Sequence, residues 1–136
     1  MAHYLLTLFF FLPPGVALVR DRSLRSLRCL TAAHLPLLRR LRQEAGAALQ
    51  RRYGVRPDQL RAFLHVPPSY YHLHVHFTHA DIAHQGTSAG RAHLLDDVID
   101  NLTLFPDYYQ RCSFTCALPE TDTLAVALRE AATKVL

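Results

Sequence analysis

Three histidines alternate with apolar residues over residues 72–77, a spacing that could serve chemistry on phosphorus or bind a metal ion. Successive side chains of a β-strand point to opposite faces of the sheet, so a strand here would place His72, His74 and His76 in one row. Four apolar side chains would face a hydrophobic core, namely Tyr71, Leu73, Val75 and Phe77. The rest of the chain must position this row of imidazoles.

Covalent catalysis at phosphorus is one chemistry open to this row. Neutral imidazole is a nucleophile at neutral pH because its unperturbed pKa is about 6.5. A neighbouring imidazolium can neutralise phosphate charge and protonate the leaving group, and a backbone carbonyl or another histidine can fix the attacking tautomer. His74 flanked by His72 and His76 is therefore sufficient for phosphoryl or nucleotidyl transfer without a metal. The alternative is three histidines that are exposed or cap the core and catalyse nothing.

Metal binding is the other chemistry. His72 and His76 would lie about 13 Å apart along a strand. They are then too far apart for both to bind one tetrahedral zinc with bonds of about 2 Å. His74 and His76 could still share an ion with a distant third ligand. The candidates for that ligand are His65, His79, His84 and Asp81. We expect no metal and no other cofactor.

The composition predicts a single folded domain. The chain has 136 residues, half of them hydrophobic, which is enough for one packed core. Cys29, Cys112 and Cys116 contain no C-x-x-C pair, which argues against a disulfide framework and against a structural zinc site. We expect free, mostly buried thiols in a reducing compartment.

The net charge of +4 conceals an asymmetry along the chain. Residues 1–66 hold eleven arginines and three acidic residues, whereas residues 67–136 hold four basic and eight acidic residues. Most of the arginines are expected on solvated helix faces. A basic half that attracts a polyphosphate or a short RNA is the alternative, because a guanidinium group fits phosphate oxygens.

The first half of the chain predicts two strands around a long helix and then the histidine strand. Residues 16–20 and 60–66 read as strands, and residues 70–78 as the strand that carries the histidines. A helix over residues 31–53 is indicated by apolar residues at three- to four-residue spacing, with Thr31 as its cap. The short connection between the last two strands favours antiparallel neighbours.

The second half predicts a loop over residues 79–89, a helix over 90–102 capped by Thr87 or Ser88, and a strand over 112–118. Asp122 can cap a final helix. The side chains expected on its buried face are Leu124, Leu128, Ala131 and Val135. The order β-α-β-β-α-β-α indicates an α+β fold with an antiparallel sheet and a long crossover helix.

Residues 72–78 match the histidine triad motif of alternating histidine and apolar residues. The stretch Pro68-Ser69-Tyr70-Tyr71 before it is similar to the segment that leads into the triad of scavenger mRNA-decapping enzymes. Further similar stretches are residues 24–31, 34–39, 91–95 and 98–102. Residues 16–136 thus resemble the catalytic domain of this family within the histidine triad superfamily, which implies a histidine-triad-like sheet.

This resemblance implies a reaction and roles for individual residues. The implied reaction hydrolyses the triphosphate bridge of a 7-methylguanosine-capped dinucleotide or short capped oligoribonucleotide, releasing 7-methylguanosine monophosphate. His74 takes the place of the nucleophile that forms a phosphohistidine. His76 and His65 hold the phosphates, and one of them or His72 orients or protonates. Ser69 and Tyr70 match positions that contact the bridge.

The chain departs from the family's pattern before residue 16. The family has a separate, swapped, dimer-forming domain there, with aromatic and acidic residues that recognise the cap. We expect a form that carries the catalytic half alone, with reduced or absent cap hydrolysis. Residues 1–15 would be a divergent apolar segment that replaces a missing strand or hangs loose. Their apolar run is too short to span a bilayer and lacks the basic start of a signal peptide.

Three alternatives follow for partners and function. The chain could be a catalytically silent isoform, a generic histidine triad hydrolase of other nucleotides, or a subunit that pairs with a full-length chain or with itself. We expect no membrane association. The resemblance implies a cytoplasmic and nuclear protein.

Overall fold

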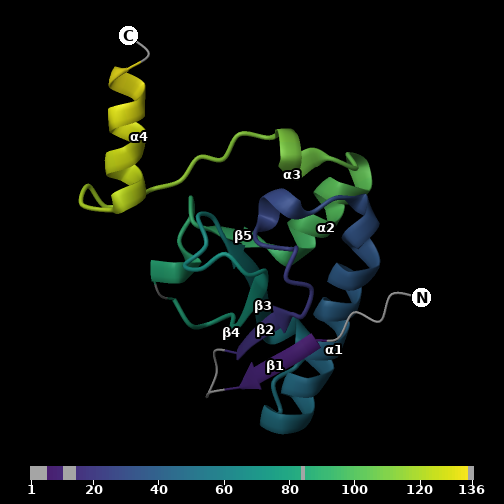
Figure 1. Cartoon of the computed structure of the whole chain (residues 1–136). Helices are drawn as coiled ribbons and strands as arrows, with labels where there is room; N and C mark the ends of the chain where they lie inside the picture. Colours follow the sequence, from purple (N-terminus) through teal and green to yellow (C-terminus); the bar gives the residue numbers. More distant parts are fainter. Residues whose placement is uncertain (1–5, 11–14, 84, 135–136) are drawn as a thin grey trace.

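The computed structural model describes residues 6–10, 15–83 and 85–134, with the backbone alone for residues 6–10. Over these residues the chain folds as an α+β domain (Figure 1). No helix in the described part of the chain is long and apolar enough to cross a membrane.

Five antiparallel strands form one sheet in the order β1-β2-β4-β3-β5. The strands are β1 (Leu6–Phe10), β2 (Gly15–Val19), β3 (Leu60–His65), β4 (His74–His79) and β5 (Ala92–Leu94). The histidine strand β4 therefore lies at the centre of the sheet, between β2 and β3.

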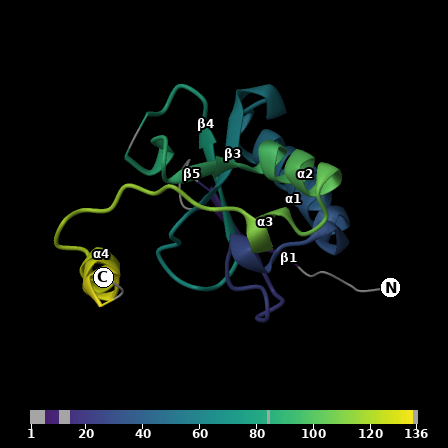
Figure 2. The ribbon, with the colours of Figure 1, turned by 90° about the horizontal axis from the view of Figure 1, so that it is seen from above.

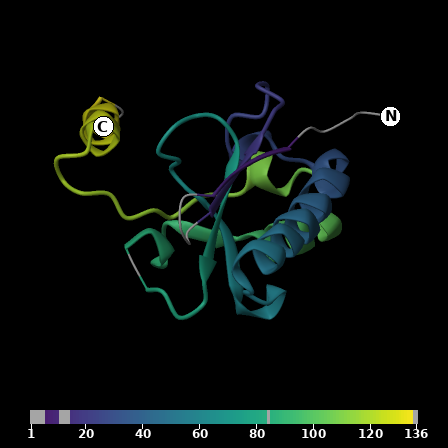
Figure 3. The same cartoon turned by 90° about the horizontal axis from the view of Figure 1, so that it is seen from below.

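Four helices accompany the sheet: α1 (Leu35–Tyr53), α2 (Leu95–Leu104), α3 (Tyr108–Arg111) and α4 (Thr123–Thr133). Seen from above and from below, α1 and α2 lie side by side against the sheet, and α4 stands apart (Figures 2 and 3). Helix α1 ends where Gly54 adopts φ +69° and donates its N–H to Gln50.

The hydrophobic core lies between the helices and one face of the sheet. Alternate residues of the strands point into it, as the period of two requires. The sheet contributes Ala17, Val19, Ala62, Leu64, Val75 and Phe77, and the helices contribute Leu37, Leu38, Leu41, Ala45, Leu49, Leu95, Val98 and Leu102. The histidines at 74 and 76 belong to the opposite face of β4.

Several predicted elements are confirmed. The strand at 16–20 and the strand at 60–66 appear as β2 and β3, each within a residue of its predicted bounds. The long helix is present, although a 3-10 turn over Ala32–His34, with Thr31 as its N-cap residue, precedes it. β3 and β4 are antiparallel neighbours, with Phe63 opposite His76. The α+β class is therefore correct.

The histidine strand is shorter than predicted. It begins at His74, because residues 70–73 form a loop in which the Leu73 N–H donates to the carbonyl of Leu24. His72 thus precedes the strand. Tyr71 is 56% exposed instead of facing the core, whereas Leu73 is buried as predicted.

The helix predicted over residues 90–102 is wrong at its start. Gly90 turns the chain with φ +79°, and the next residues pair with β3 as β5. Helix α2 begins only at Leu95, and neither Thr87 nor Ser88 caps it. β3 has a free edge on which a short strand can pair, and β5 occupies it. The spacing of apolar residues in the sequence indicates a helix and does not show this pairing.

The strand predicted over residues 112–118 is also wrong. This segment is extended but pairs with no strand in the described part of the chain. Its alternate side chains Cys112, Phe114 and Cys116 are all half-buried, so the prediction that they share a face is confirmed. All three cysteines are free thiols, and none is fully buried.

The final helix has the predicted cap but not the predicted buried face. The carboxylate of Asp122 accepts a hydrogen bond from the Leu124 N–H at 2.8 Å. Leu124 and Leu128 are 37% and 55% exposed, and Ala131 is exposed too. Val135 lies outside the described residues. An apolar stripe on a helix does not ensure that another surface packs against it, and none of the described residues of α4 is buried.

The elements follow one another in the order β-β-α-β-β-β-α-α-α.

The apolar start of the chain supplies a strand. Residues Leu6–Phe10 pair antiparallel with β2 and form the edge of the sheet. A strand therefore forms within the segment of residues 1–15. Residues 1–5 and 11–14 lie outside the described part of the chain.

The arginines of α1 lie largely on its solvated side. Arg40 pairs with Glu44 at 2.6 Å along the helix, and Arg42 pairs with Asp96 of α2 at 3.2 Å. These contacts agree with the solvated-face interpretation of the basic half. Exposed pairs of this kind stabilise a fold by about 0–1 kcal/mol each.

Candidate active site

Three imidazoles gather on the face of the sheet opposite the helices. The ring centroids of His65 and His76 are 4.4 Å apart, and those of His74 and His76 are 4.9 Å apart. β3 supplies the first ring and β4 the other two, and the Phe63 ring stacks on His76 at 5.2 Å. The antiparallel register of the two strands is what brings these side chains together.

His74 is held in one tautomer. Its Nδ1 lies 2.8 Å from the carbonyl oxygen of His72, which can only accept a hydrogen bond. Nδ1 therefore carries the hydrogen, and Nε2 of the neutral ring carries the lone pair. This Nε2 is buried and has no hydrogen-bond partner among the described residues. The lone pair of this nitrogen is therefore not engaged by a hydrogen bond among the described residues.

Tyr70, on the loop before β4, lies over the His74 ring, and Ser69 precedes it in the chain. The Tyr70 ring stacks on the His74 ring, with centroids 4.3 Å apart and planes 10° apart. Tyr70 is 49% exposed and Ser69 is exposed, whereas His74 is only 4% exposed. The loop thus covers the reactive ring with groups that solvent and a ligand can reach.

His72 does not join the cluster of rings. Its Nε2 lies 2.5 Å from the carbonyl of Val19, and it donates its hydrogen there. What His72 offers to His74 is its backbone carbonyl. The predicted row of three histidines therefore becomes a group made of His65, His74 and His76.

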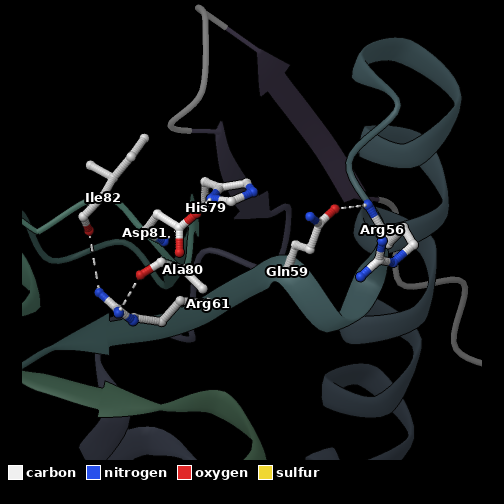
Figure 4. A network of polar contacts seen from close by, with 7 residues as sticks. All are labelled: Arg56, Gln59, Arg61, His79, Ala80, Asp81 and Ile82. Carbon is white, nitrogen blue, oxygen red and sulfur yellow. Dashed lines mark hydrogen bonds and ion pairs between the residues drawn. The ribbon is translucent and has the colours of Figure 1, made fainter.

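The loop after β4 supports the cluster from its far side. The carbonyl of Gly86 accepts a hydrogen bond from Nε2 of His65 at 2.7 Å. Closer to the strand, Arg61 donates to the carbonyls of Ala80 and Ile82 and so fixes the start of this loop (Figure 4). The loop therefore fixes the orientation of His65, and its path depends on Arg61.

A narrow crevice reaches His74. Its walls include His65, His72, Pro68 and the guanidinium-bearing Arg25, and among the described residues no carboxylate lines it. Arg25 rests over the Tyr71 ring at 5.7 Å. The local field therefore favours an anion near the histidines.

A larger cleft of about 530 Å³ adjoins this crevice, and Pro68 lines both. Ser69 and Arg91 line the cleft together with the segment around Ala117 and Leu118, and Asp122 also lines it. A cleft of this size is within the range of small-molecule sites.

Arg91 lines the cleft, which the predicted helix over residues 90–102 does not indicate. It lies just before β5, and its carbonyl accepts a hydrogen bond from the Val66 N–H at 2.9 Å. The sequence does carry a signal, because residues 62–90 contain no lysine or arginine. An isolated cation after a histidine-rich loop is a candidate anion contact.

The metal interpretation gains no support from the described residues. Nowhere among them do three histidine, cysteine or acidic side chains lie close enough to hold one ion. His79 and Asp81 pair with each other at 3.5 Å, and His84 lies outside the described residues.

Comparison with known proteins gives a consistent family. The family model described as "Scavenger mRNA decapping enzyme C-term binding" matches residues 15–93. The chain is 51% identical to "m7GpppX diphosphatase" of Bos taurus and 47% identical to that of Homo sapiens, each over 116 residues. These alignments cover 85% of this chain and 34% of each relative.

A more distant relative extends the comparison. "m7GpppX diphosphatase" of Caenorhabditis elegans is 36% identical over 116 residues, which cover 85% of this chain and 37% of the relative. The chain thus spans about a third of the length of the curated relatives it matches. On its matched residues and its identity to these relatives, the chain belongs to the scavenger mRNA-decapping enzyme family.

Proposed function

We propose that this chain carries the catalytic half of a cap-scavenging hydrolase. The observation that carries the proposal is His74, whose Nδ1–H is bound to a carbonyl while its Nε2 lacks a hydrogen-bond partner among the described residues. The names of the relatives add the substrate, because each is called "m7GpppX diphosphatase". The proposed substrate is a 7-methylguanosine-capped dinucleotide or a short capped oligoribonucleotide.

The proposed reaction proceeds in two displacements. The lone pair of Nε2 of His74 attacks the phosphorus that bears 7-methylguanosine, and the P–O bond to the rest of the bridge breaks. The leaving nucleoside diphosphate takes a proton from a neighbouring imidazolium. Water then gives a proton back to the imidazole that protonated the leaving group and attacks the same phosphorus. The P–N bond breaks, the lone pair returns to Nε2 of His74, and 7-methylguanosine monophosphate leaves.

The surrounding groups have roles that follow from their positions. His65 and His76 would hold the phosphates in their charged form, and one of them would supply the proton, because the His72 ring lies outside the cluster and is bound to the Val19 carbonyl. Ser69 and Tyr70 would contact the bridge. Arg91 would bind a phosphate oxygen of the leaving portion from the adjoining cleft. None of these roles needs a metal ion.

We expect this chain to turn over slowly. Binding energy from remote parts of a substrate supports the chemical step. The chain covers only 34% of the Bos taurus relative, so contacts that the rest of such a protein would supply are not provided by it. Pairing with a full-length subunit or with a second copy of the chain would be one way to supply these contacts. A chain that is catalytically silent alone would then function only as part of such a pair. We propose a cytoplasmic and nuclear location for the protein, as the resemblance to the family implies.

The test is hydrolysis of a capped dinucleotide, followed by mass spectrometry of released 7-methylguanosine monophosphate. We expect the native chain to exceed His74→Asn, and His79→Asn to match the native chain, because His79 lies outside the cluster. An unmethylated dinucleotide cleaved equally well would point to a generic nucleotide hydrolase. Product release by the native chain at the rate of His74→Asn would contradict the proposal.

A further inference from the structure

Phe114, in the segment between α3 and α4, sits in a cage of three side chains. The guanidinium carbon of Arg28 lies 4.2 Å from its ring centroid. The His93 ring meets it edge-on at 5.4 Å, and the Tyr109 ring lies nearly parallel to it at 6.1 Å. A cation over the face of a ring and an edge-to-face contact are both attractive arrangements.

Arg28 ties this cage to the backbone of the same segment. It donates to the carbonyl of Tyr109 at 2.9 Å and to that of Cys112 at 2.5 Å. Its own position is fixed, because it belongs to the 3-10 turn Leu27–Cys29, in which Leu27 is buried. One guanidinium therefore holds both the ring and the main chain that leads to it.

Beyond Phe114 the segment depends on this anchor. Over the described residues, no backbone–backbone hydrogen bond joins residues 113–121 to the sheet or its loops. The segment does pass close to Gly90, where an added Cβ would lie 3.7 Å from the Ala117 nitrogen. It then lines the same cleft as Ser69 and Arg91, through Ala117, Leu118, Pro119 and Asp122.

We propose that the Phe114 cage is a positioning device that holds residues 115–122 as the outer wall of the cleft, where they contact the leaving nucleoside diphosphate. This inference rests on the proposed function, because that function assigns the cleft to the leaving portion of the substrate. Phe114 and Arg28 are positioning residues, since they act on the substrate through residues 115–122.

The chain carries its own probe of the anchor. Cys116 is half-buried within the segment, and Cys29 packs against the core. The rates at which a thiol reagent modifies each cysteine, resolved by peptide mass spectrometry, report the segment and the core separately. We expect Phe114→Ala to speed modification of Cys116 about tenfold and to leave Cys29 unchanged. Arg28→Gln should speed modification of Cys116 to a similar extent. Phe114→Tyr, which keeps the ring, should restore the native rate.

The second readout is binding of adenosine diphosphate, as the probe for the leaving portion. We expect its Kd to rise about tenfold in Phe114→Ala and Arg28→Gln, and to stay unchanged in Phe105→Ala, which alters an exposed phenylalanine outside the cleft. An unchanged Cys116 rate would overturn the anchor. A faster Cys116 with unchanged nucleotide binding, or a native chain that does not bind the probe, would overturn the role of the wall.

These outcomes are separable from failure of the proposed function. The function depends on bond formation at His74, which the cage does not touch. A native chain that binds the probe through the wall but never modifies His74 would support this inference and contradict the function. A chain in which His74 forms the phosphohistidine, while the Phe114 variants bind adenosine diphosphate normally, would support the proposed function and contradict this inference.

Discussion

At His74 a single backbone carbonyl decides which ring nitrogen can react. The bond from Nδ1 to the His72 carbonyl leaves the lone pair on Nε2, and the centre of the His76 ring lies 4.9 Å from the centre of the His74 ring. A side-chain partner in place of the carbonyl could exchange protons with the ring. A carbonyl can only accept, so the tautomer does not change with the protonation of its partner.

Tyr109 is a second single residue with a testable consequence, because its pKa makes the stability of the fold depend on pH. Burial raises its pKa to about 12, although a hydrogen bond from Asn101 at 2.9 Å opposes the shift. The folded-state pKa lies above the unfolded value of about 10, so this contribution to stability is present below pH 10 and is lost as the pH rises through 12. Denaturant unfolding should therefore give a lower free energy of unfolding for the native chain at pH 11 than at pH 9.

A variant isolates that contribution. Tyr109→Phe should lose about 0.5–1.5 kcal/mol at neutral pH with the hydrogen bond, and its stability should fall less between pH 9 and pH 11. Tyr71→Phe is the control, because Tyr71 is exposed. An equal alkaline loss in the native chain and in Tyr109→Phe would rule out this origin.

At the scale of the element, α1 is the support that keeps the sheet in place. Leu41 lies at its centre with 0% exposure, packed in the core between α1 and the strands. Leu41→Ala should lower the free energy of unfolding by about 2–5 kcal/mol. Arg40→Ala, one position away on the solvated side, should cost less than about 1 kcal/mol. Urea unfolding followed by circular dichroism would measure both, and equal losses would contradict the packing described.

For helix α4 we expect the opposite result, namely that truncating an apolar side chain has little effect on the free energy of unfolding. Its described residues include none that is buried, and its apolar side chains Val126 and Leu128 are exposed. Leu128→Ala should therefore change the free energy of unfolding by no more than about 0.5 kcal/mol. A loss of several kcal/mol would mean that α4 packs against the domain or against another copy in solution.

The sequence predicts the elements best where a local period matches the final burial. The alternation around Ala17 and Val75 and the helical stripe through Leu41 all point into the core, so β2, α1 and β4 follow from pattern alone. β5 is too short to carry a period, and its formation depends on the turn at Gly90 and the open edge of β3. The stripe on α4 shows an amphipathic helix but contains no information about a partner surface.

At the scale of the whole molecule, the site joins parts of the chain that lie far apart in sequence. The alternation of histidines predicts the rings of β4, and antiparallel pairing with β3 adds His65. Arg91 and the wall around Ala117 follow from neither, because their positions depend on how two loops cross the end of the sheet. The sequence pattern therefore predicts the histidine cluster but not the cleft beside it.

The central claim is that Nε2 of His74 forms a bond to phosphorus, and the most direct test is to find that bond. The native chain is incubated with a capped dinucleotide, quenched at alkaline pH, where a P–N bond survives, and digested with trypsin. Residues 62–91 come off as one peptide because Arg61 and Arg91 bound a stretch without lysine or arginine. Fragmentation of that peptide should place a 7-methylguanosine monophosphate adduct on His74 in the native chain and in His79→Asn. The same treatment of His74→Asn should yield no adduct. A native chain without the adduct, or an adduct that persists in His74→Asn, would contradict the account.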